Sequence, residues 1–161
     1  MHHYIKVWLQ TEAEPLSFPV AEAAWGRFKR SFAAKREGFF IFAAQDGRTV
    51  ALNLKYARLA QLWLETDGKK EPACAEGHEV MLLFAHSDAV TFEARDSLEW
   101  AGIFSSIRAA KGGEVLSFTD SNGRLVMFST DELMLLAAPT VFVEEGYKQI
   151  YFRERGTLPP S

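Results

Sequence analysis

The sequence predicts an α+β protein made by tandem duplication of one β-α-β-β(-β) unit of about 75 residues. Three pairs of similar segments recur in the same order at nearly constant separation. Phe18 and Phe92 are 74 residues apart, Trp25 and Trp100 are 75 apart, and the turns Asp46-Gly47 and Asn122-Gly123 are 76 apart. Separations that grow by one residue at a time are what short loop insertions produce in a duplicated chain.

The first copy, residues 1–66, begins with a strand predicted over Tyr4–Gln10. A helix is predicted over about Pro19–Lys35, with the proline in the first turn, where its missing N–H is tolerated. Four apolar residues of this segment recur at helical spacing and predict a buried stripe: Ala21, Trp25, Phe28 and Phe32. Arg27 and Arg30 fall on the other side of the helix, so we expect both to be exposed.

A β-hairpin is predicted after this helix, with Gly38 as a left-handed C-terminal cap. Its strands are Phe39–Ala44 and Arg48–Leu54, and they are joined by Asp46-Gly47, a dipeptide that tolerates the positive φ angles of a tight turn. The pattern of Lys55–Glu65 fits a helix and a strand equally well.

The second copy, residues 78–152, repeats this plan, starting with a strand over Val80–Ala85. Asp96 is predicted to cap the second helix, with Glu99 bonding back to the N-cap residue. Gly112-Gly113 is expected to end this helix. Its buried stripe is predicted to consist of Trp100, Ile103, Phe104, Ile107 and Ala110.

Two further hairpins are predicted in the second copy. The first joins Val115–Thr119 to Arg124–Phe128 across Asn122-Gly123, and the second joins Val141–Val143 to Tyr147–Phe152 across Glu144-Glu145-Gly146. Between them, Ser129–Ala138 fits either a helix or a strand.

The two copies are expected to form one compact domain. Residues 67–77 are polar and turn-forming and make the loop between the copies, and residues 153–161 are expected to be a mobile tail. One helix with three or four strands buries little apolar surface alone. We therefore expect a shared, antiparallel β-rich core with two amphipathic helices outside it, related by a pseudo-twofold axis.

Composition indicates a globular protein of the cytoplasm. The hydrophobic fraction is 48%, and the longest uncharged apolar stretch, Leu133–Val143, has 11 residues. About 20 such residues are needed to cross a bilayer, so no membrane association is predicted. A single cysteine, Cys74, excludes an internal disulfide and is typical of a reducing compartment.

Three residues with metal-binding side chains lie near one another in the sequence: Cys74, His78 and His86. Structural zinc sites use four well-spaced ligands, so we favour the interpretation that these residues are incidental. No metal and no cofactor is predicted.

The sequence contains no recognisable catalytic motif. His86-Ser87-Asp88 has the residue types of a hydrolytic triad, but consecutive residues of an extended chain point to opposite faces. Nucleophile elbows, phosphate-binding glycine loops and His-Glu-x-x-His zinc motifs do not occur. We therefore predict no catalytic residues. An enzyme with a site in the cleft between the copies stays an alternative.

A basic segment is the strongest candidate for a binding surface. Residues 27–58 contain eight Lys or Arg against two acidic residues, a balance of +6, while the rest of the chain carries −9. The candidate anion-binding or nucleic-acid-binding residues are Arg27, Arg30, Lys35, Arg36 and Arg48. Cations at the end of a helix also complement its dipole, which alone would account for Lys35 and Arg36.

Helix, strand, Asp-Gly turn and strand occur here in an order that resembles Sm-like RNA-binding barrels, and the resemblance is confined to that order. The sequence favours a non-enzymatic binding or accessory protein that acts through protein or small-molecule contacts, with either another protein or a second copy of the chain as its partner. Nucleic-acid binding through the basic first copy is the alternative from a second class.

Overall fold

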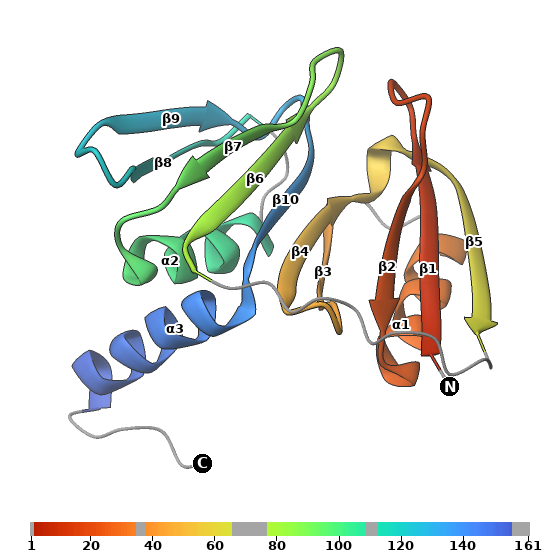
Figure 1. The fold of residues 1–161 in the computed structure, drawn as a ribbon, viewed down its shortest axis with the longest axis horizontal. Coiled ribbons are helices and arrows are strands. Elements are labelled where there is room, and N and C mark those ends of the chain that lie inside the picture. The colour runs from red at the N-terminus through yellow and green to blue at the C-terminus, as the bar shows by residue number, and fades with distance from the viewer. Residues whose placement is uncertain (1, 35–37, 66–76, 109–112, 156–161) are drawn as a thin grey trace.

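The computed structural model describes residues 2–34, 38–65, 77–108 and 113–155. Within these ranges the chain is a mixed α+β protein with antiparallel sheets and three α-helices (Figure 1). The elements in chain order are β1 (His2–Leu9), β2 (Leu16–Val20), α1 (Glu22–Ala33), β3 (Phe39–Ala43), β4 (Arg48–Asn53), the 3₁₀ turn η1 (Leu54–Tyr56), β5 (Ala57–Glu65), β6 (Glu79–Phe84), β7 (Val90–Glu93), α2 (Ser97–Arg108), β8 (Val115–Thr119), β9 (Leu125–Ser129), β10 (Leu133–Pro139) and α3 (Thr140–Arg155).

The strands form three antiparallel sheets. A three-stranded sheet has the order β2-β1-β5, a five-stranded sheet has the order β3-β4-β10-β6-β7, and β8 and β9 form a separate hairpin. The β4–β10 pairing joins the two halves of the chain, because β4 comes from the first half and β10 from the second. Every residue of β10 is buried, which explains why its sequence shows no alternation of polar and apolar residues.

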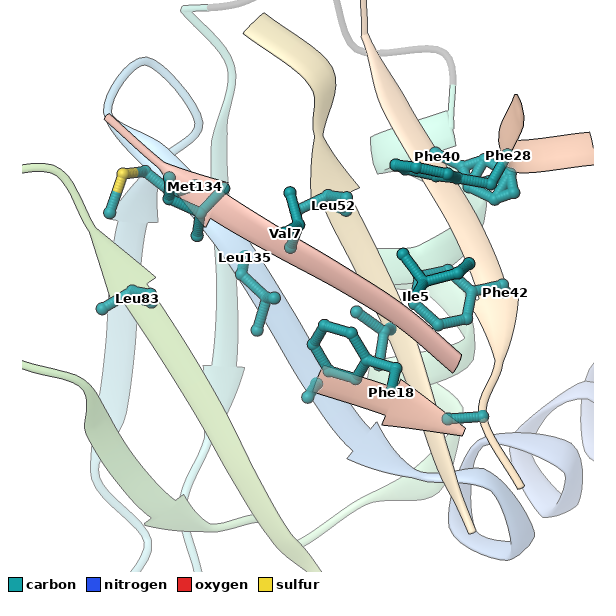
Figure 2. Close-up of a cluster of buried hydrophobic side chains, with 14 of the residues drawn as sticks. Ile5, Val7, Phe18, Phe28, Phe40, Phe42, Leu52, Leu83, Met134 and Leu135 are labelled. Atoms are coloured by element: carbon teal, nitrogen blue, oxygen red, sulfur yellow. The ribbon is translucent and has the colours of Figure 1, made fainter. Parts of the chain in front are cut away.

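The core has two layers, one on each face of the five-stranded sheet. The first core cluster lies between this sheet and the three-stranded sheet, where Ile5 and Phe18 face Leu52 and Leu135 (Figure 2). The second core cluster lies on the opposite face, where alternate residues of the same strands pack against α2 and the β8–β9 hairpin. Trp100 is at the centre of the second cluster and is completely buried.

Strand pairings of the first half have counterparts in the second half at matching register. The matched pairs are Ile5–Phe18 with Val80–Phe92, Val7–Ala60 with Leu82–Leu136, and Phe42–Val50 with Phe118–Val126. Corresponding residues are 74 to 76 positions apart. Both α1 and α2 have 12 residues, and Trp25 and Trp100 are each the fourth residue of their helix.

The first helix begins later than the sequence predicted. Pro19 belongs to β2 and pairs with Tyr4, and α1 begins at Glu22. β2 is an edge strand of its sheet, so the missing N–H of the proline costs no ladder hydrogen bond if it points outward. A strand, β2, therefore lies between β1 and α1, where the predicted β-α-β-β(-β) unit has none, and β7 occupies the same place in the second half.

The predicted hairpin over Val141–Val143 and Tyr147–Phe152 is wrong. These residues form the long helix α3, which also includes residues 153–155, so the described part of the chain has three α-helices rather than two. The prediction failed because Gly146 was taken for a turn residue. In the structure this glycine lies where α3 crosses α2, and a side chain at that position would collide with the backbone of Ser97. Residues 156–161 of the predicted tail lie outside the described residues.

Other local predictions are confirmed. Gly47 and Gly123 have φ angles of 86° and 80° in the two hairpin turns. Both ambiguous stretches are mainly strand, because Lys55–Glu65 contains β5 after a 3₁₀ turn and Ser129–Ala138 contains most of β10. Asp96 accepts a hydrogen bond from the Leu98 N–H at 2.9 Å, as a cap does. Glu99, however, accepts from the Thr119 N–H at 3.1 Å and so ties α2 to β8 instead of completing the cap.

Candidate anion-binding site

Helix α1 presents two arginines beside an aromatic surface. Phe28 faces the core and packs edge-to-face against Phe40, with ring centroids 5.5 Å apart. Arg27 and Arg30 are exposed, as predicted, and share one face of the helix because they are three residues apart. The Arg27 guanidinium lies over the Phe40 ring, 5.5 Å from its centroid, within the range of a cation–π contact.

An open pocket of about 470 Å³ lies where α1, β3 and α2 meet. Its polar lining consists of Arg27, Arg30, Ser31 and Arg108, and its apolar lining consists of Phe39, Phe40, Ile41 and Leu54. Arg108 is in the last turn of α2, so the two halves of the chain both supply guanidinium groups. The volume is within the range of small-molecule sites.

The three pocket arginines have no ion-pair partner among the residues that the structure describes. The ion pair present there joins Arg48 to Asp46. Arg30 lies in the last turn of α1 and Arg108 in the last turn of α2, so each positive charge complements the dipole of its own helix. Arg27 lies earlier in α1 and is held instead by its cation–π contact with Phe40. Three guanidinium groups around one hollow repel one another, and a bound anion would relieve this repulsion.

The chemistry of the pocket suits an anion that also carries an apolar part. A guanidinium group offers planar, paired donors that match carboxylate and phosphate oxygens. Phe39 and Phe40 supply apolar surface next to these donors. The lining contains no carboxylate or imidazole, and Ser31 is its one side-chain hydroxyl, so the described lining offers groups for binding but no general base.

The remaining residues of the predicted basic surface do not join this pocket. Arg48 donates from Nε to the Asp46 carboxylate at 2.9 Å, and its guanidinium lies 5.3 Å from the Phe18 ring centroid. It lines a separate hollow of about 280 Å³ together with Glu79 and Met81. Lys35 and Arg36 lie outside the described residues.

Arg108 is the pocket residue that sequence reasoning missed. In the sequence it is 78 positions from Arg30, in a segment whose charges are balanced. The contact between α2 and β3 brings it to the pocket. The repeat did not point to Arg108 either. The residues of α2 that correspond to Arg27 and Arg30 are Gly102 and Ser105, which carry no charge.

The two candidate metal ligands that the structure describes, His78 and His86, are not brought together. His78 precedes β6 and His86 follows it, and a strand of six residues separates them by roughly 20 Å. The His78 ring instead lies 4.6 Å from the Phe142 ring. Cys74 lies outside the described residues. In the part of the chain that the structure does describe, no group of three or more His, Cys, Asp or Glu side chains could hold a metal ion.

His86-Ser87-Asp88 forms the turn between β6 and β7. His86 has a φ angle of 66°, and all three residues are exposed. The Ser87 hydroxyl donates to the Phe84 carbonyl at 3.4 Å, which is a local turn contact.

Comparison with known proteins found no relative of this chain. No family model matches the chain, and neither the curated proteins nor the solved structures gave a significant match. Among the described helices, none is long and apolar enough to span a membrane.

Proposed function

We propose that the protein is a non-enzymatic binding protein that holds a small anionic ligand in the pocket between α1, β3 and α2. The observation that supports this proposal is that Arg27, Arg30 and Arg108 line one pocket together with two phenylalanines. None of the three arginines is ion-paired within the described residues. The chemical class is a phosphate or carboxylate attached to a flat apolar group. The lone cysteine of the chain supports a cytoplasmic location for this role.

A small ligand is favoured over a nucleic acid because of charge. The chain outside residues 27–58 carries −9, so a polyanion would be repelled over most of the surface. A small anion needs only the electrostatic field inside the pocket, where three arginines belong to the described lining.

We also propose that the chain arose by tandem duplication and has a pseudo-twofold axis between residues 1–66 and 78–152, with residues 67–77 as the connecting loop. Matching registers in three strand pairings support this proposal. The His86 N–H donates to the Thr11 hydroxyl at 3.2 Å, and these positions are 75 residues apart. Contacts between corresponding positions are what a twofold axis produces. Duplication would account for a pocket assembled at the junction of the halves.

The pocket is tested by titrating the protein calorimetrically with phenyl phosphate, benzoate and inorganic phosphate. We expect phenyl phosphate to bind more tightly than inorganic phosphate, because only the former covers Phe39 and Phe40. Hydrogen bonds to charged groups contribute about 1.5–3 kcal/mol, so losing one arginine should weaken binding about 10- to 100-fold. The Arg27→Glu, Arg30→Glu double variant should bind none of the three probes measurably.

Arg153→Glu is the matched control, because Arg153 is an exposed arginine on α3 outside the pocket. Its affinity for phenyl phosphate should equal that of the wild type. The proposal would be contradicted if the control and the double variant lost the same amount of affinity, or if the wild type bound none of the probes. An unselected single-stranded oligonucleotide should bind no more tightly than about 10⁻⁴ M. Tighter, salt-dependent binding that the double variant loses would favour the nucleic-acid alternative.

A further inference from the structure

The β8–β9 hairpin has an outer face that nothing covers in the described part of the chain. Three large apolar side chains on this face are exposed: Val115 at 61%, Leu125 at 65% and Met127 at 64%. The opposite face of the hairpin, with Phe118 and Phe128, belongs to the second core cluster. Large apolar side chains that are exposed together on one face of a small hairpin are typical of a contact site.

The corresponding face in the first half is covered. By the offset of 76 residues, Ala51 of β4 corresponds to Met127 of β9, and Phe39 of β3 corresponds to Val115 of β8. Ala51 is completely buried, and both Ala51 and Phe39 pack against the second core cluster. The β3–β4 hairpin therefore uses its outer face to contact the other half of the chain, whereas the β8–β9 hairpin does not.

The backbone hydrogen-bonding edges of the strands also differ between the two halves. β4 pairs with β10, and their counterparts under the offset are β9 and β5. In the described chain, however, β9 pairs only with β8, and β5 pairs only with β1. Edge strands are usually protected by charges or proline. β9 contains neither. β5 has charged residues only near its two ends, Arg58 and Glu65, and exposes Leu59 at 54%.

β9 and β5 cannot complete this pairing inside one molecule. The turns next to them meet, because the Tyr56 hydroxyl donates to the Asp131 carbonyl at 2.9 Å. From that point β9 and β5 run apart toward opposite sides of the molecule (Figure 1). Within the described residues, therefore, no strand of the same molecule completes either edge.

Charge favours a second copy of this chain as that molecule. Residues 1–66 hold nine basic and six acidic residues, a balance of +3, and residues 78–161 hold seven basic and twelve acidic residues, a balance of −5. The first half of one copy and the second half of another therefore attract each other.

We propose that the β9 edge of one copy pairs antiparallel with the β5 edge of a second copy, which buries the outer face of the β8–β9 hairpin. This proposal rests on the duplication and not on the anion site. The β4–β10 pairing supplies the register. It pairs Ala51 with Leu136 and Thr49 with Ala138, so the contact between copies pairs Met127 with Ala60 and Leu125 with Leu62. Each copy has one β9 edge and one β5 edge, and two copies that exchange both contacts close into a dimer.

The register is tested by disulfide trapping in a Cys74→Ser background. Directly opposed residues of an antiparallel pair have Cα atoms about 4.5–5.5 Å apart, within the range that a disulfide bridges. The Ala60→Cys, Met127→Cys variant should therefore form covalent dimers or larger species on a non-reducing gel. The matched control is Gln61→Cys, Met127→Cys, whose cysteines would point to opposite faces and should crosslink at least tenfold less. Equal yields, no crosslinking, or a disulfide only within monomers would overturn the proposal.

Association without crosslinking is tested by light scattering during size-exclusion chromatography. The wild type is expected to form dimers or larger species, and these should weaken as salt is raised. Met127→Lys should shift the protein to monomer, because it places a charge in the buried contact. Val141→Lys is the control, since Val141 is 73% exposed on α3, away from both edges. A wild type that stays monomeric at millimolar concentration, or a control that dissociates equally, would refute the contact.

Discussion

Replacing Trp100 by alanine is expected to lower the free energy of unfolding by about 3–5 kcal/mol. Trp100 is completely buried, and its ring lies 4.9 Å from Phe118 and 6.3 Å from Phe104, measured between centroids. Alanine would leave a cavity between α2 and β8 that these rings cannot fill without breaking their own packing. Because domains of this size are stable by about 5–15 kcal/mol, this loss is a large fraction of the total.

The measurement is urea denaturation followed by far-ultraviolet circular dichroism, which does not depend on tryptophan fluorescence. Trp25→Ala is the comparison, because Trp25 occupies the same position in α1 but is only half-buried and packs edge-to-face on His3. Trp25→Ala should lower the free energy of unfolding by clearly less than Trp100→Ala does. If Trp100→Ala is insoluble, Trp100→Phe tests the same packing. The buried indole N–H of Trp100 has no hydrogen-bond partner among the described residues, so the phenylalanine variant loses volume but none of the described hydrogen bonds. A loss below about 1 kcal/mol for Trp100→Ala would contradict its core position.

The sequence predicted those elements whose signals are local. The hairpin turns at Gly47 and Gly123 could be located because a glycine after Asp or Asn tolerates positive φ angles, whatever the rest of the chain does. The stripe of α2 was located in the same way, since Trp100 and Ile107 recur at helical spacing. Both kinds of signal depend on a few neighbouring residues.

The elements that sequence reasoning missed depend on contacts between distant residues. β2 and β7 are short, of five and four residues, and exist because they pair with the edges of β1 and β6. α3 contains β-branched Val141 and Val143, which favour strands, and Gly146, which favours turns. Packing against α2 overrides these local preferences, and nothing in the segment itself reveals that packing.

The candidate site could be predicted only in part for the same reason. Helical spacing placed Arg27 and Arg30 on one exposed face, and the structure agrees. The sequence grouped Arg48 with them because it is near in the chain, whereas the structure pairs Arg48 with Asp46. Arg108 joins the pocket from the other half. Proximity in the sequence therefore identified the helix face but not the full set of cations that meet there.

Replacing Gly146 by alanine is expected to destabilise the protein by about 1–3 kcal/mol or more, although alanine is normally the better helix former. A Cβ atom at this position would lie 2.6 Å from the Ser97 carbonyl carbon and 2.8 Å from the Ala101 Cβ, and closer still to the Ser97 carbonyl oxygen. These are backbone and near-backbone atoms of α2, so no rotamer change can relieve the overlap. α3 would have to move away from α2, which would also break the bond from Gln149 Nε2 to Ser97 Oγ.

Gly102→Ala separates this collision from the intrinsic preference of helices for alanine. Gly102 lies in the middle of α2, and a Cβ atom there would meet nothing within 4 Å. The same substitution should therefore stabilise the protein by about 0.5–1 kcal/mol at Gly102, because only the helix preference acts there. Urea denaturation of the two variants should give changes of opposite sign. If Gly146→Ala were also neutral or stabilising, α3 would not cross α2 at this glycine, and the packing that distinguishes α3 from the expected hairpin would be wrong.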